Sequence, residues 1–368
     1  MGAYAPPDAL AFRATLDPWL AGLPPSALAS HHYFGLAATQ PPWFDTGIDL
    51  VAGDTVTWLA DGRVYLSKLL DIWVGPSFQL WCRVGTAGPV FRGTRATHTF
   101  TAAQSGRLWL ASYFPGEWAD TGGRLGTSPA EYAKVSGGMS VLILRWNRTA
   151  DVPALFRGFS HETRVPGLVV AELQRLDQPV PTPEQWDYLW YVGTSEIYRS
   201  AVRSDGRPTI CCHTHGDVGI LRREARLRLE PGARLRWSWR VDALPVDLPE
   251  DTLPSHDYLS IAVEFDDGQD ITYYWSSSLP VGKVYRCPLP TWKAKETHVV
   301  VRSGTAELGR WLDEERDLFE DYRNIIGGPA RSVVRVWLIA NSLFQRGHGQ
   351  CEYAHIVLGG PDRAIDVL

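Results

Sequence analysis

The chain has 368 residues, of which 21% are charged, and a formal net charge of −5. Hydrophobic residues make up 45% of the sequence, which is enough for a packed core and excludes a disordered, coiled-coil or collagen-like chain. At about 150 residues per domain, the length predicts two domains. The weakly acidic balance excludes a general attraction to phosphate backbones, so nucleic acid is not an expected partner.

Tryptophan is the unusual component, because the chain has 16 Trp and only 2 Met. Large rigid rings either fill the core of a β-sandwich or form platforms for flat ligands such as sugars. Trp73, Trp118 and Trp275 are the candidate platforms. Both interpretations stay open at this stage.

Residues 1–45 are rich in proline and weakly patterned, which predicts an extended arm that packs over the body. Neither a secretion signal nor an apolar run near the roughly 20 residues of a membrane span is evident. The five cysteines show no Cys-x-x-Cys spacing, so neither a disulfide framework nor a Cys-based zinc site is expected. We therefore expect a cytoplasmic protein without a membrane partner.

Residues 46–150 have the alternation of an all-β domain. Apolar and polar residues alternate over 47–62, two strands flank the turn at 104–106, and residues 139–146 predict a buried strand. Residues 151–185 form a Pro-rich connection with a possible strand at 167–176.

Residues 186–368 return to strand-like segments separated by turns. Residues 311–326 differ, because their apolar side chains recur with a helical period and Gly327-Gly328 follows as a stop signal. The whole pattern predicts an all-β protein with two β-sandwich domains of the jelly-roll or carbohydrate-binding-module type, and one helix in the second.

The first domain resembles the calcium-dependent galactophilic bacterial lectins. The matching segments are GIDLVAGDTVTWLADG, WVGP at 73–76, LWCRVG, GRLWLASYFPGEW and GMSVLIL. In that family a Tyr, an Asp and a Thr/Asn loop hold calcium, and Tyr65 and the loop 113–123 take those places here. The paired asparagines are missing, and Glu117, Asp120 and Thr121 are few oxygen ligands for an ion that takes six to eight, so bound calcium is not expected.

The second domain resembles a bacterial family of unknown function, DUF3047. The matching segments are LRWSWRV, the strand ending in Val263-Glu264-Phe265, YYWSS, VVVRSG and ERDLFEDYR. The resemblance implies a β-sandwich and supplies no activity. The chain departs from the family's usual pattern at Cys211–Asp217, at His256-Asp257 and at 341–352, where histidines and apolar residues replace small or acidic ones.

These departures place histidines together as candidate ligands. His213 and His215 are two residues apart, so both side chains share one face of a strand. With His256 as third ligand they form a candidate metal site, and with His348 a candidate cofactor-binding set. Imidazoles with one carboxylate suit zinc or non-haem iron, and a single histidine beside an apolar pocket suits haem. A hydrogen-bonded or surface histidine pair is the simpler alternative.

Three functions compete. The first is an enzyme, a haem- or iron-dependent oxygenase of the aryl-alkene type, acting on a small apolar or aromatic molecule, with His256, Asp257 and Glu264 as catalytic residues. The second is a two-module carbohydrate-binding protein. The third is a cofactor-free isomerase or cyclase that uses Asp257 or Glu264 as an acid. Hydrolase, NTPase and nicotinamide motifs are absent from the sequence, and a homo-oligomer is possible in each case.

Overall fold

The computed structural model describes residues 9–158 and 165–368, and the chain divides into two compact units, Met1–Val180 and Pro181–Leu368. The division lies inside the Pro-rich stretch 151–185. No helix in the described part of the chain is long and apolar enough to cross a bilayer.

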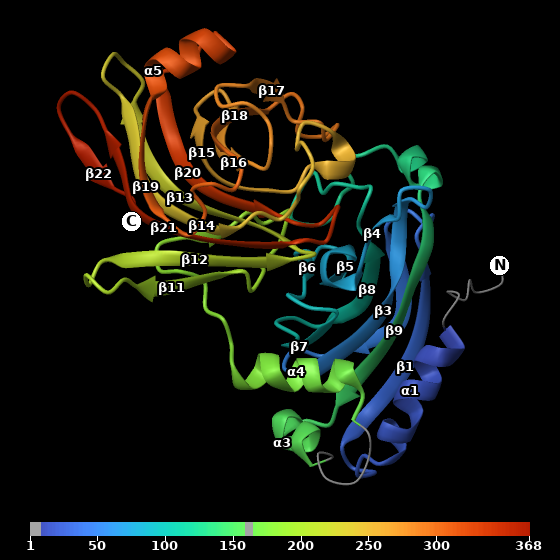
Figure 1. Ribbon diagram of the computed structural model, residues 1–368. Helices are drawn as coiled ribbons and strands as arrows, with labels where there is room; N and C mark the ends of the chain where they lie inside the picture. The colour runs from blue at the N-terminus through green and yellow to red at the C-terminus, as the bar shows by residue number, and fades with distance from the viewer. Residues whose placement is uncertain (1–8, 159–164) are drawn as a thin grey trace. The chain divides into compact units, whose positions relative to one another are not determined.

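The first unit is a β-sandwich of two sheets (Figure 1). One sheet contains β1 (Leu28–Ala37), β9 (Ser136–Trp146), β3 (Thr55–Ser67), β4 (Ile72–Val74) and β7 (Thr97–Thr101). The other contains β2 (Trp43–Leu50), β8 (Gly106–Ser112), β5 (Leu80–Val84) and β6 (Phe91–Arg92), with the short helix α2 (Pro76–Gln79) before β5. Trp58, Leu110 and Val141 belong to the apolar core formed by residues of both sheets. The strands predicted at 47–62, on both sides of 104–106 and at 139–146 are confirmed.

Helices cover the second face of the five-stranded sheet. They are α1 (Ala9–Ala21), α3 (Val152–Arg157) and α4 (Gly167–Asp177), whose apolar residues pack on Leu142 and Leu144 of β9. The expected arm over 1–45 is therefore wrong where the structure describes it, because the segment supplies α1 and β1; residues 1–8 lie outside the described part. The strand expected at 167–176 is helix α4 instead.

The sequence period explains both corrections. Phe12, Leu16 and Trp19 recur at helical spacing and are all buried. In α4, Val169 and Glu172 share the buried face, where the Glu172 carboxylate receives hydrogen bonds from Arg175 and Thr97. In the sequence, Glu172 fits the polar position of an alternating strand, because its buried pairing with Arg175 is not evident there.

The second unit is also a sandwich. Its seven-stranded sheet has the order β10 (Asp187–Tyr188), β13 (Val218–Arg228), β20 (Ser332–Asn341), β15 (Tyr258–Phe265), β16 (Asp270–Ser276), β18 (Glu296–Ser303) and β17 (Val284–Arg286). Its six-stranded sheet has the order β11 (Tyr198–Val202), β12 (Pro208–His215), β21 (His348–Gly359), β14 (Arg234–Ala243) and β19 (Trp311–Asp317), with β22 (Ala364–Asp366) also paired to β21. Trp237, Trp239 and Trp275 lie in the core with residues of both sheets.

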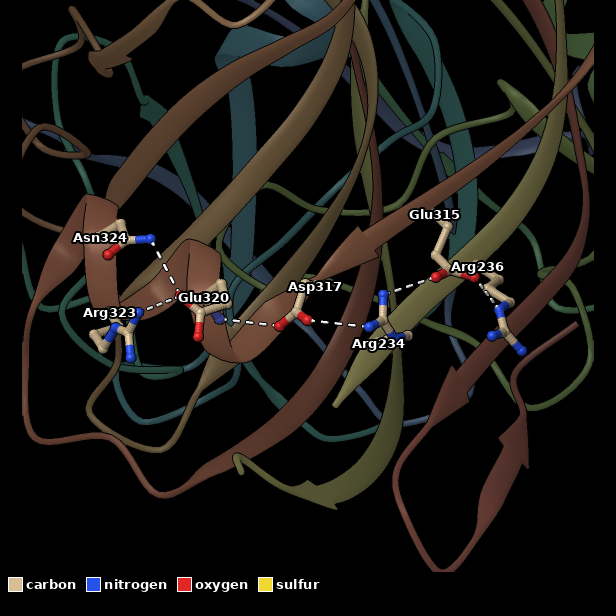
Figure 2. A network of polar contacts seen from close by, with 7 residues as sticks. All are labelled: Arg234, Arg236, Glu315, Asp317, Glu320, Arg323 and Asn324. Atoms are coloured by element: carbon tan, nitrogen blue, oxygen red, sulfur yellow. Dashed lines mark hydrogen bonds and ion pairs between the residues drawn. The ribbon is translucent and has the colours of Figure 1, made fainter. Parts of the chain in front are cut away.

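The predicted helix over 311–326 begins later than expected. Trp311–Asp317 is strand β19, which pairs with β14 along its whole length, and only α5 (Leu318–Asp321) and the π-helical turn Tyr322–Ile326 are helical. Asp317 ends the strand and caps the helix, since its carboxylate accepts the N–H of Glu320 at 3.0 Å. Figure 2 shows how ion pairs join this corner to β14, with Arg234 and Arg236 both bonded to Glu315.

Candidate functional site

Three of the predicted ligands meet on the six-stranded sheet. His213 and His215 point from β12 and His348 from the start of β21, where His215 and His348 are paired in register. The ring of His348 lies 6.5 Å from each of the other two rings, measured between centroids. All three side chains are exposed. We call this group the open histidine cluster.

The fourth predicted ligand, His256, lies elsewhere. It precedes β15 of the other sheet and is fully buried, whereas His213 and His215 face solvent. Its Nδ1 lies 2.7 Å from the carbonyl oxygen of Glu250. The structure therefore does not unite the predicted metal set of His213, His215 and His256.

The predicted catalytic carboxylates have structural partners. Asp257 is buried and accepts the backbone N–H groups of Phe344 at 3.0 Å and Gln345 at 2.6 Å. Burial raises its pKa to about 6, against the opposing effect of these two N–H groups. Glu264 accepts hydrogen bonds from Arg335 at 2.9 Å and from the indole of Trp337 at 3.1 Å. Both carboxylates are thus engaged in joining neighbouring strands and loops.

His256 instead joins a cluster that the sequence did not predict. Its partners are Cys287, Glu296 and His298, and one ligand atom from each of the four residues lies within 4.8 Å of the others. All four side chains are buried. We call these four residues the buried cluster. Among the residues that the structure describes, they are the group of possible metal ligands whose atoms converge.

The sheet geometry explains why these residues converge. Glu296 and His298 are two apart on β18, so both project from the face opposite Val299, which belongs to the core. Cys287 directly follows β17, and its backbone N–H donates to the carbonyl of Glu296 at 3.1 Å. The loop that ends at His256 closes over the same face.

Burial sets the charge states in this cluster. Burial and, to a smaller extent, the neighbouring His298 lower the pKa of His256 to about 3, so the ring is neutral at pH 7. Burial also raises the pKa of the Cys287 thiol far above its usual range. Burial alone would raise the pKa of Glu296, but the attraction of His298, whose Nε2 lies 3.4 Å from Oε1, outweighs it and holds the pKa at about 2.

One signal could have revealed the cluster. Glu296-Thr297-His298 has the same spacing of possible ligands as His213-Thr214-His215. The other two members are far apart in the chain, and only the pairing of β17 with β18 and the covering loop bring them near. No local motif encodes such a set.

The outer face of the six-stranded sheet carries a second candidate site. Trp311 is half-buried at its edge, with the guanidinium of Arg203 4.0 Å from the ring centroid and that of Arg240 at 5.7 Å. Arg240 also bonds to Asp242 at 3.1 Å and lies 3.3 Å from Glu352. We call Trp311 and these polar neighbours the open face.

The lectin-like loop of the first unit has other roles. The Asp120 carboxylate accepts the backbone N–H and the guanidinium N–H of Arg124. Trp118, a predicted platform, is 3% exposed and stacks on Trp43, and Trp275 is 1% exposed. Both are core residues, so they are wrong as platforms; Trp73 is half-buried beneath Arg63.

Comparisons with known proteins address both units. Residues 184–357 match the family model described as "Protein of unknown function (DUF3047)", which confirms that predicted resemblance. The search of curated proteins found no match.

Similar solved structures include the EclA N-terminal domain, a PllA-like lectin, at 17% identity and a TM-score of 0.24, covering 32% of this chain and 97% of that one. The xyloglucanase domain of NopAA from Sinorhizobium fredii, in complex with cellobiose, has 9% identity and a TM-score of 0.30 over 49% of this chain and 96% of that one. TmCBM61 in complex with β-1,4-galactotriose has 11% identity and a TM-score of 0.24 over 48% and 89%. The sheets of both units agree with the predicted β-sandwich fold, and a lectin is among the similar structures, as the resemblance of the first domain implied.

The predicted oxygenase, with its small apolar or aromatic substrate and its haem or non-haem iron centre, is wrong as the main interpretation. The similar structures named above are titled as a lectin, a xyloglucanase domain and a complex with galactotriose, and none of these three is an oxygenase. The physical reason lies in this chain itself. Its large aromatic side chains mostly fill the sandwich cores, and the histidines expected around one iron are divided between an exposed sheet face and a buried loop.

Proposed function

We propose that this chain, whose second unit carries a DUF3047 domain, is a carbohydrate-binding protein and that the open face around Trp311 is its sugar-binding surface. The observation that supports it is the combination at that face of one half-buried indole with planar guanidinium and carboxylate groups. These are the groups that hold a sugar, because its C–H face packs on an aromatic ring while its hydroxyl groups bond to paired donors and acceptors.

The polar groups of the open face are held in place before any ligand binds. Glu352 receives a hydrogen bond from Thr209 at 2.6 Å and lies 3.3 Å from the Arg240 guanidinium. Asp242 fixes the other side of Arg240. A ligand therefore meets side chains whose rotamers are already restricted, which lowers the entropic cost of binding.

The two sheets of this unit differ in their outer faces. Over the seven-stranded sheet, Tyr258, Thr272 and His298 are buried beneath other segments. On the six-stranded sheet, Arg236, Asp313 and Glu315 of β14 and β19 stay exposed. The open face is thus the sheet surface of this unit that an extended ligand can reach.

Glycan-array screening followed by calorimetry on the full chain tests the proposal. Trp311→Ala should weaken binding of any sugar that is found by about tenfold to a hundredfold, because truncating an aromatic anchor costs about 1.5–3 kcal/mol. Trp190→Ala is the matched control, since Trp190 is also half-buried but packs on Tyr191 outside the open face. An array without sugar binding, or equal losses in both variants, would overturn the proposal.

A further inference from the structure

The geometry of the buried cluster points to a metal site that is separate from the open face. The Cys287 sulfur lies 3.3 Å from Nε2 of His256, and Nε2 of His298 lies 3.4 Å from Oε1 of Glu296. Zinc bonds of about 2.0–2.3 Å in a tetrahedron place neighbouring ligand atoms about 3.3–3.6 Å apart. These two spacings match edges of such a tetrahedron, and the four ligand atoms all lie within 4.8 Å of one another.

A second observation comes from His298. Its side chain is completely buried, yet neither ring nitrogen makes a hydrogen bond. Leaving a buried polar atom unpaired costs about 1–3 kcal/mol, so such atoms normally have a partner. Nε2 faces the Glu296 carboxylate within the cluster, and a cation bound there would give this nitrogen a partner.

Aromatic rings fix the direction of the His298 side chain. Tyr285 stacks on it at 5.1 Å between centroids, and Tyr258 and Tyr274 meet it edge-on at 4.9 and 5.6 Å. The imidazole is thus held in one orientation by packing, as preorganised ligands require.

The other ligands have the supporting partners typical of metal sites. Nδ1 of His256 bonds to the Glu250 carbonyl, which leaves Nε2 with a lone pair directed at the cluster. The hydroxyls of Tyr258 and Thr272 donate to Oε1 of Glu296 at 3.0 and 3.2 Å. Glu250 is in turn anchored, because its carboxylate accepts Ser276 Oγ–H and the Ser277 N–H.

We propose that His256, Cys287, Glu296 and His298 bind one Zn²⁺ ion. The set combines one sulfur, two imidazole nitrogens and one carboxylate oxygen, all of which are zinc ligands. Binding converts the Cys287 thiol to a thiolate and releases its proton to solvent, and no redox step is involved.

The site is structural and not catalytic. Four protein ligands complete a tetrahedron, and all four side chains are 3% exposed or less, so no position stays open for a substrate or water. The ion would tie the loop that ends at His256 to Cys287 and to strand β18. It would thereby hold the segments that cover the seven-stranded sheet.

The test is metal analysis of the full chain expressed with zinc and dialysed against metal-free buffer. We expect about one zinc per chain in the native protein and less than about a tenth of that in Cys287→Ser. Cys351→Ser is the matched control, because Cys351 is also a buried free thiol of this unit but belongs to the core. It should keep its zinc.

Two further measurements keep the proposal falsifiable if Cys287→Ser folds poorly. Cobalt-substituted native protein should show a thiolate-to-cobalt charge-transfer band with tetrahedral d–d bands, and Glu296→Gln should alter the d–d bands while keeping the charge-transfer band. The variant H213A/H215A/H348A removes the open histidine cluster and should retain zinc. Native protein free of metal, or zinc lost with the open histidine cluster and kept without Cys287, would overturn the proposal.

Discussion

Two segments of the second unit share a pattern but differ in environment. His213-Thr214-His215 on β12 and Glu296-Thr297-His298 on β18 each place two possible ligands on one side of a strand. The first pair lies on an exposed sheet face, and the second lies beneath loops that contribute His256 and Cys287. Spacing alone therefore does not distinguish a solvated histidine pair from part of a closed ligand set.

Whether loops cover a sheet face determines whether its histidine side chains are solvated or need a partner within the protein. Exposed imidazoles hydrogen-bond to water and need no protein partner. A buried imidazole without a hydrogen bond, such as that of His298, is costly, and a bound cation would lower that cost. We therefore expect changes at the buried cluster to have large effects on folding and metal content. Changes at the open histidine cluster should have small effects on folding.

The largest effect is expected from removing the metal. A strong chelator should lower the Tm of the second unit by about 10–20 °C if zinc contributes about 5 kcal/mol to folding. The first unit should be unaffected, because the described part of that unit contains no comparable set of converging ligands. Calorimetry with and without chelator measures both transitions, and two unchanged transitions would contradict the expectation.

Asp257→Asn should have the next largest effect. The change removes one of two carboxylate oxygens that accept the N–H groups of Phe344 and Gln345, so we expect a loss of about 1–3 kcal/mol in the free energy of unfolding. Urea denaturation measures it, with the exposed Asp313→Asn as control. A loss of sugar binding without a loss of stability would instead return Asp257 to a functional role.

Glu315→Ala should have only a small effect on the free energy of unfolding, although Glu315 bonds to both Arg234 and Arg236 (Figure 2). All three side chains are substantially exposed, so solvent screens the attraction. The loss should shrink further in high salt. A larger, salt-independent loss in urea denaturation would show that this corner is packed more tightly than its exposure indicates.

The open histidine cluster should have the smallest effect on folding. Replacing His213, His215 and His348 together by alanine should change the free energy of unfolding by no more than about 0.5 kcal/mol per site, since exposed side chains without buried partners contribute little. Thermal denaturation checks this. A drop in Tm comparable with that of the chelated protein would remove the distinction between the two regions.

The sequence predicted the sandwich strands well, because segments such as 139–146 and 258–265 are apolar or alternate in a period-two pattern. It failed where proline or charge hid a helix, as with Pro18 inside α1 and the paired Glu172 in α4. It also failed at Trp311–Asp317, because the apolar residues of 311–326 recur with a helical period although this first part is a strand paired with β14.

The candidate sites were also predicted only as far as local sequence spacing allows. Local spacing located His213 and His215, whose rings each lie 6.5 Å from that of His348 between centroids. His256 was selected for the wrong partners, because its neighbours Cys287 and His298 are set by strand pairing and loop closure that no local pattern records.

Anomalous diffraction from crystals of the full chain, recorded on both sides of the zinc absorption edge, tests the central claim most directly. We expect one peak enclosed by His256, Cys287, Glu296 and His298 and no peak of similar height at the open histidine cluster. A peak only between His213, His215 and His348, or no peak at all, would contradict it.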